Sequence, residues 1–147
     1  MMARVTDALT AAPISLHFTR LRGDGSGKAE VEKAKLLLTG HRKAGGCIRL
    51  CADEQVQAGL GLAEGIETAL RVMADGWHPV WAAIDAGNMA TWPVLLGVES
   101  LTLFADHDKA GLRSADTCRT RWRDAGRECR IVSPREIGAD WADVVTS

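Results

Sequence analysis

The sequence predicts an α/β fold: a parallel sheet of about four strands with helices on both faces, preceded by a small β-rich element. From about residue 58 onward, short apolar runs alternate three times with stretches of helical periodicity, a pattern typical of parallel sheets. Residues 1–57 instead carry strand-like runs separated by glycine-rich turns. The 147 residues are 46% apolar and 25% charged, as in one globular domain. We therefore expect two parts, residues 1–57 and residues 58–147.

The α/β part is expected to contain four strands and three helices. The strands are short apolar runs at residues 60–63, 80–84, 101–105 and 129–132. The helices are stretches with apolar residues at helical spacing, residues 66–73, 88–96 and 109–125. Gly76 and Gly126 follow two of these stretches and indicate where the helices end.

The N-terminal part is expected to form a hairpin followed by one more strand. Residues 15–21 alternate between apolar and polar side chains, and the glycine-rich run 23–27 is a flexible turn. Residues 47–50 form another short apolar run. The first dozen residues are weakly patterned and are expected to fray.

Two motifs that would point to other functions are absent or incomplete. The glycine-rich run is not a phosphate loop, because three residues rather than four separate its outer glycines and alanine follows Lys28. A structural zinc site is not expected, because only one pair among the four cysteines is closely spaced. The cysteines are expected to be reduced thiols: Cys47, Cys51, Cys118 and Cys129.

Charge is divided unevenly along the chain. Residues 1–57 hold nine Lys/Arg and six Asp/Glu, a net charge of +3, whereas residues 58–147 hold nine and thirteen, a net charge of −4. This suggests polyanion contact at one end and a cation site at the other, although solvated surface explains it equally well. No apolar run is long enough to span a membrane and no export signal is present, so we expect a cytoplasmic location and no membrane partner.

Acidic residues follow three of the expected strands. Glu64 follows the first, Asp106 and Asp108 follow the third, and Asp140 and Asp143 follow the fourth. Because ligands bind at the carboxyl ends of parallel strands, these side chains should share one crevice. Clustered carboxylates need a neutralising cation, and Mg²⁺ is bound by one or two carboxylates together with water and phosphate. The alternative is that the aspartates are helix caps or first-turn charges.

Four further segments follow one another along the chain: AEGIETAL (63–70), AGN (86–88), FADHDKAG (104–111) and GADWADVV (138–145). In this order they resemble a Toprim domain, the catalytic fold of bacterial-type primases, type IA and type II topoisomerases and some nucleases. The similarity is greatest to Toprim domains of phage and plasmid primases or primase–helicases. It covers roughly residues 58–145, and the basic segment 20–50 also resembles the stretch that precedes such domains.

The resemblance implies a role for each matching residue. Glu64 matches the general acid/base, Asp106 and Asp108 match the metal pair that binds Mg²⁺ or Mn²⁺, and Asp140 matches the later acidic motif. The basic positions after the aspartates are Lys109 and Arg113. Replicative primases have an aspartate where this chain has Thr68, one residue after Glu67, which leaves open whether Glu67, or Asp143 in the later motif, joins the metal site.

Three functions are compatible with these residues. Primase-type nucleotidyl transfer comes first, with a single-stranded DNA or RNA/DNA template, nucleoside triphosphates and a replicative helicase as the implied partners. A Toprim nuclease would use the same carboxylates, and a non-catalytic module binding nucleic acid or a replication protein is the third. A topoisomerase would need a nucleophilic tyrosine, and this chain contains none. The cations expected to follow the nucleic-acid backbone are Lys28, Lys33, Lys35, Arg42, Lys43 and Arg49.

Overall fold

A computed structural model describes residues 1–135 and 141. Its strands are β1 (Met2–Asp7), β2 (Pro13–Thr19), β3 (Lys35–Leu37), β4 (Gly46–Arg49), β5 (Gly59–Ala63), β6 (Val80–Ala82), β7 (Ser100–Phe104) and β8 (Glu128–Val132). Its helices are the short 3-10 helix η1 (Asp53–Gln55) and the α-helices α1 (Ile66–Ala74), α2 (Ala86–Ala90) and α3 (Lys109–Asp124). The expected alternation of strands and helices after residue 58 is confirmed.

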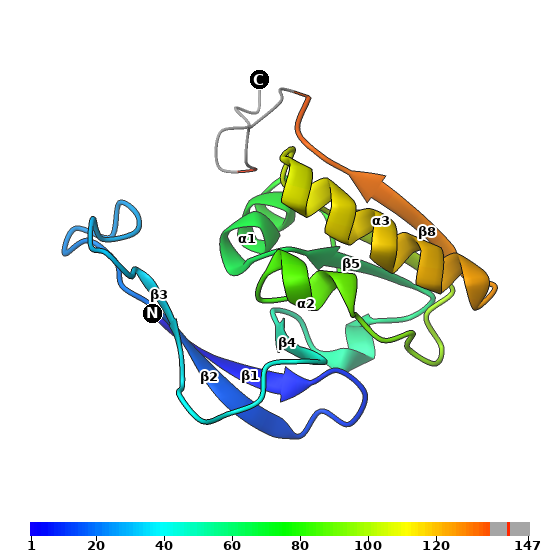
Figure 1. Cartoon of the computed structure of the whole chain (residues 1–147), viewed down its shortest axis with the longest axis horizontal. Coiled ribbons are helices and arrows are strands. Elements are labelled where there is room, and N and C mark those ends of the chain that lie inside the picture. Colours follow the sequence, from blue (N-terminus) through cyan, green and yellow to red (C-terminus); the bar gives the residue numbers. More distant parts are fainter. Residues whose placement is uncertain (136–140, 142–147) are drawn as a thin grey trace.

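The sheet is larger than the sequence analysis predicted, with eight strands rather than about four, in the order β3-β2-β1-β4-β6-β5-β7-β8. The four expected parallel strands form one part of it, in the order β6-β5-β7-β8. Strand β4 pairs antiparallel with β6 and also with β1, so it joins the N-terminal strands to the parallel part. The N-terminal strands therefore extend the same sheet (Figure 1).

Helices cover both faces of the parallel part, as predicted. On one face, buried residues of α1 pack with Val5, Ile48 and Phe104. On the other face, Met89 of α2 and Trp122 of α3 belong to the larger core cluster, together with inward side chains of β5 and β7. Val5 and Ile48 in one cluster, and Ala8 and Cys47 in the other, come from the N-terminal part, so both cores are shared by the two halves of the chain.

Two expected elements differ from the structure. The first dozen residues do not fray: Met2–Asp7 pair with β2 over five residue pairs, and these backbone hydrogen bonds hold the N-terminus in the sheet. The helix expected over residues 88–96 is shorter, because α2 spans Ala86–Ala90 and ends at Thr91, two residues before Pro93.

The expected turn at 23–27 is present, with a bridge between Leu21 and Lys28. Among the described residues, no helix is long and apolar enough to cross a bilayer.

Candidate active site

An acidic residue follows the carboxyl end of each of three neighbouring parallel strands. Strands β6, β5 and β7 lie side by side, and the chain continues beyond their carboxyl ends to Asp85, Glu64 and Asp106 respectively. The Glu64 amide donates to the carbonyl of Phe104 at 3.1 Å, which extends the pairing of β5 and β7 to this point. We call Glu64, Asp85, Asp106 and Asp108 the carboxylate rim.

Glu64 occupies an unusual electrostatic position on the rim. Partial burial, followed by the negative charges of Asp106 and Asp108, raises the pKa of its carboxyl group to about 7. Hydrogen bonding to the Asp106 amide acts in the opposite direction and is weaker. Its Oε2 atom is buried and has no hydrogen-bond partner among the described residues. A carboxyl group with this pKa can both accept and release a proton near neutral pH.

Gly111 lets the first turn of α3 approach Glu64 closely. A Cβ atom at Gly111 would lie 2.7 Å from the carbonyl oxygen of Asp106 and 3.0 Å from Glu64 Oε2. Backbone cannot move aside at such a distance without displacing the strand end. The glycine of the FADHDKAG segment is thus required for packing beside the candidate general acid/base.

Asp106 and Asp108 differ in their surroundings. Asp108 is the N-cap of α3, and its Oδ1 accepts the backbone N–H of Gly111 at 2.7 Å. The alternative interpretation of the aspartates as helix caps is therefore correct for Asp108, which caps α3 through its Oδ1 atom. Asp106 is half-buried and does not cap the helix.

The donor set fits a partly hydrated divalent cation rather than a full protein cage. Within residues 1–135 and 141, no three Asp, Glu, His or Cys side chains converge closely enough to enclose a metal ion. The rim nonetheless offers only oxygen ligands, one of them the unpartnered Glu64 Oε2. Mg²⁺ keeps several waters and takes few carboxylates, so this arrangement suits it when phosphate oxygens complete its shell.

Asp85 and Asn88 also lie at the site; the sequence analysis quoted Asn88 within the AGN segment but did not name Asp85. Asp85 caps α2 by accepting the Asn88 amide, and its negative charge adds to the effect on the Glu64 pKa. The buried Asn88 side chain donates to the carbonyls of Gly46 and Ala83, both at 2.7 Å, and accepts from the Gly45 amide at 3.0 Å. Asn88 thus fastens the N-terminal part to the rim. An acid after the apolar run 80–84 was the available signal for Asp85.

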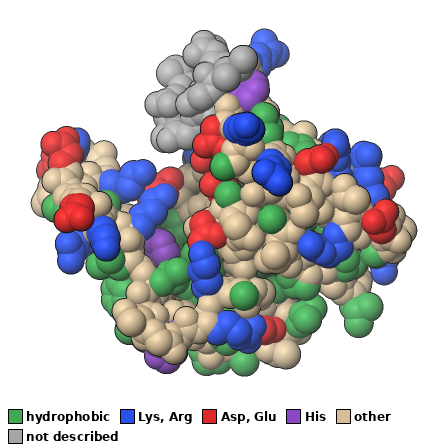
Figure 2. Space-filling model, viewed as in Figure 1, with side chains coloured by type: hydrophobic (Ala, Val, Ile, Leu, Met, Phe, Trp, Pro, Cys, Tyr) green, Lys and Arg blue, Asp and Glu red, His purple; other side chains and the backbone are tan. Residues whose placement is uncertain are grey.

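Lysines from the N-terminal part reach carboxylates of the α/β part. Lys35 lies 2.6 Å and Lys28 3.8 Å from the carboxylate oxygens of Glu67, on the first turn of α1. Lys43 pairs with Asp85 of the rim. We call Lys28, Lys35 and Lys43 the lysine cluster. Figure 2 shows the surface hollowed between the two parts, with basic and acidic side chains on its walls; we call this hollow the cleft.

The remaining predicted cations are distributed around the molecule. Arg42 pairs with Asp7 at 2.8 Å and lowers the pKa of that carboxyl group to about 2. Lys109 and Arg113 are exposed on the first turns of α3, directly after Asp108, and Lys33 is exposed between β2 and β3.

The predicted acidic residues of the later motif, Asp140 and Asp143, lie outside the described residues. Between them, Trp141 donates from Nε1 to the carbonyl of Ala105 at 3.1 Å.

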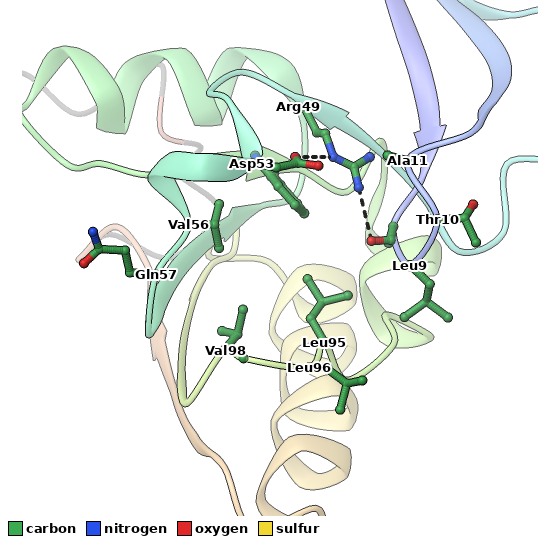
Figure 3. A pocket seen from close by; sticks show the side chains of 13 residues that line it. Leu9, Thr10, Ala11, Arg49, Asp53, Val56, Gln57, Leu95, Leu96 and Val98 are labelled. Carbon is green, nitrogen blue, oxygen red and sulfur yellow. Dashed lines mark hydrogen bonds and ion pairs between the residues drawn. The ribbon is translucent and has the colours of Figure 1, made fainter.

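Arg49 lies away from the lysine cluster. Its guanidinium donates to Asp53 at 2.7 Å and to the Ala8 carbonyl at 3.1 Å, and it lies 4.4 Å from the ring centroid of Trp81. It lines a cavity of about 700 Å³ that also includes Leu95 and Val98 (Figure 3). Val98 precedes β7, so this cavity is near the amino ends of the parallel strands, opposite the rim.

Comparisons with known proteins agree with this geometry. Residues 59–147 match a family model described as a Toprim domain, and no curated protein matches the chain. Among solved structures, a DNA primase domain from Pseudomonas aeruginosa is 14% identical, with a TM-score of 0.54. A primase from Aquifex aeolicus, comprising zinc-binding and RNA polymerase domains, is 16% identical, with a TM-score of 0.61. The DnaG primase catalytic domain bound to ssDNA is also 16% identical, with a TM-score of 0.58.

These structures resemble nearly the whole chain but are much longer than it. The similarity covers 95% of this chain in each case, but only 50%, 35% and 46% of the respective primase chains. At such low identity the likeness concerns the fold, including the N-terminal strands that the family model does not reach. The family match itself spans more than half of the sequence and includes every residue of the carboxylate rim. The chain therefore belongs to the Toprim domain family.

Proposed function

We propose that this chain is the metal-dependent catalytic domain of a primase, which joins nucleotides on a single-stranded template. The observation that carries the proposal is the rim itself: Glu64, with a pKa near 7, beside Asp106 and Asp108 at adjacent strand ends. The fold likeness to DNA primase domains supports nucleotidyl transfer over other Toprim chemistries. Because the chain spans half or less of those proteins, the complete activity is assigned to the assembly in which it works.

Three rim residues, and three residues beside the rim in sequence or in the later motif, have a proposed part in the reaction. Asp106 and Asp108, with Asp140 from the later motif, would hold Mg²⁺ or Mn²⁺. That ion, when bound, neutralises nucleotide phosphates and favours in-line attack. Glu64 takes the proton from the attacking hydroxyl group, for which a pKa near the working pH is suited. Lys109 and Arg113 follow Asp108 on an exposed face of α3 and bind phosphate oxygens of the incoming nucleoside triphosphate.

The N-terminal part supplies the proposed path for the template. A polyanion approaching several carboxylates is repelled unless cations flank them. Lys28 and Lys35 pair with Glu67, and Lys43 pairs with Asp85 of the rim. Lys33 and Arg42 are proposed to add positive charge along the same path. The motif order further suggests a phage or plasmid primase, in which a replicative helicase is the natural partner.

A metal-dependent assay with single-stranded DNA and labelled nucleotides tests the proposal, scored for both extension and cleavage. Primer synthesis that requires Mg²⁺ or Mn²⁺, and that falls by about 10²–10⁴-fold in Glu64→Gln, is the expected result. Metal-dependent cleavage without extension would instead favour a nuclease built on the same carboxylates. Normal turnover by Glu64→Gln would contradict the role of Glu64. A control adds, as separate polypeptides, the parts of a primase that lie outside the region similar to this chain.

A further inference from the structure

Glu67 makes a contact that the proposed chemistry does not require. Its side chain is 31% exposed, and its two oxygens face Lys35 at 2.6 Å and Lys28 at 3.8 Å. The two lysines come from different segments of the N-terminal part: Lys28 follows the glycine-rich turn, and Lys35 begins β3. Two ammonium groups around one carboxylate at the edge of a cleft form the kind of pocket that also accepts a phosphate group.

The beginning of α1 adds a second source of positive potential at the same point. Its N-cap is Gly65, which has no side chain to accept the orphan amides of the first turn. A Cβ atom placed on Gly65 would lie 3.9 Å from Lys35 Nζ and 3.8 Å from Glu67 Oε2, which shows how close both charged groups are to the helix start. The open helix N-terminus, with its partial positive charge, is therefore next to the two lysines.

A buried histidine beside this pocket lacks a polar partner. His17 on β2 is only 5% exposed, and its Nδ1 atom has no hydrogen-bond partner among the described residues. It pairs in register with Leu37 of β3, two residues from Lys35. Burial and then Lys35 lower its pKa, whereas Glu67 raises it. The His17 ring thus lies within electrostatic reach of both charged groups, and its unpartnered Nδ1 atom is buried.

We propose that Lys28, Lys35 and the open first turn of α1 form a phosphate subsite of the cleft, which Glu67 occupies as an internal competitor until a ligand phosphate displaces it. The subsite rests on the proposed function for the identity of its ligand, a phosphate group of the template strand or of a nucleoside triphosphate. Its consequence is unusual for an acidic residue beside a nucleic-acid path. Removing the charge of Glu67 should tighten binding only where the lysines are present.

Fluorescence anisotropy with a short labelled oligothymidylate, in EDTA, tests this with the full chain. Glu67→Gln should bind about three- to tenfold more tightly, because the ion pairs of Glu67 with Lys28 and Lys35 need no longer break and one repulsive charge is gone. Its salt dependence should steepen by up to about 1.4, or about 0.7 for each released lysine. Adding Lys28→Ala and Lys35→Ala to Glu67→Gln should abolish the gain.

Glu99→Gln is the matched control, because it frees Arg127 from an ion pair at the other end of β7. Equal effects of Glu67→Gln and Glu99→Gln, or a gain that persists without the two lysines, would overturn the subsite. So would an absence of oligonucleotide binding by Glu67→Gln, provided that its thermal midpoint matches the wild type. Displacement of the oligonucleotide by ATP, more effective on Glu67→Gln, would identify the nucleotide as the source of the phosphate, and failure of ATP to compete would identify the strand.

The outcome is separable from that of the proposed function. A lysine-dependent gain in Glu67→Gln without any primer synthesis would leave the subsite standing and remove the primase assignment. Primer synthesis by the wild type without a lysine-dependent gain in Glu67→Gln would support the primase assignment and remove the subsite.

Discussion

Replacing Glu64 with glutamine should stabilise the folded chain above neutral pH, although the same change removes the candidate general acid/base. In the folded chain, partial burial and the neighbouring aspartates raise the Glu64 pKa from 4.5 to about 7. Between these two values the unfolded chain has lost the proton while the folded chain retains it. The free energy of unfolding therefore falls as the pH rises through this window.

The size of the effect follows from the shift. At about 1.36 kcal/mol per pKa unit, full expression of the shift would amount to about 3 kcal/mol. The carboxyl group is only partly buried, so solvent screening reduces the expected penalty to about 1–2 kcal/mol at pH 8. For a chain of this length, relief of that penalty in Glu64→Gln raises the thermal midpoint by about 3–8 °C. At pH 5 about a quarter of the effect remains, because this pH lies only about half a unit above the unfolded-state pKa of 4.5, so little of the window in which the two states differ has been crossed.

Thermal and urea unfolding of the wild type and Glu64→Gln, each at pH 5 and pH 8 in EDTA, measures this difference. Glu99→Gln serves as the control for loss of an acidic charge at the opposite end of β7. A midpoint for Glu64→Gln that is equal to or below the wild type at pH 8 would refute the reasoning. An increase of the same size at both pH values would refute it as well, because the gain would then be independent of titration.

Three further predictions concern the rim and its support. The double substitution of Asp106→Asn and Asp108→Asn should abolish Mg²⁺ binding in calorimetry. Helix content by circular dichroism should be unchanged, because asparagine also caps helices. Retained Mg²⁺ binding would contradict the assignment. Gly111→Ala should destabilise the fold by about 1–3 kcal/mol in urea titrations, since the new methyl group meets the Asp106 carbonyl at 2.7 Å, whereas wild-type stability would show that α3 can shift. Asn88→Ala should cost about 2–3 kcal/mol, because three buried hydrogen bonds between residues 45–46, Ala83 and Asn88 are lost; a loss below about 0.5 kcal/mol would show that water replaces them.

The parallel part of the fold was predictable from the sequence because three of its strands, β5, β6 and β7, are buried on both faces. Such strands read as short apolar runs, and an acid after each run marks the strand end at the rim. Glu64, Asp106 and Asp108 were found in this way, and the structure places them at adjacent strand ends. Asp85 follows the same rule less visibly, because β6 ends at Ala82 and Asp85 lies three residues beyond it, directly before the AGN segment.

The rest depended on contacts between residues far apart in the sequence. Strand β1 alternates only weakly between buried and exposed residues, so its place in the sheet comes from pairing with β2 and β4 rather than from its own residues. The sheet becomes continuous through β4 and β6, which pair at only two positions, Ile48 with Ala82 and Arg49 with Trp81. A prediction from local periodicity cannot find such a short contact, which is why four strands were expected where eight form one sheet.

The opposite net charges of the two halves acquire a definite meaning once this sheet is formed. The lysine cluster does not neutralise the centre of the rim: its partners are Glu67 and Asp85, which flank Glu64 on α1 and beyond β6. Among the described residues Glu64 has no ion pair, and partial burial beside two aspartates keeps its pKa near 7. Had a lysine reached Glu64, its pKa would fall and its use as a general base at neutral pH would be lost. The N-terminal part therefore places positive charge beside the rim without lowering the pKa of Glu64, as the proposed role of Glu64 as a general base requires.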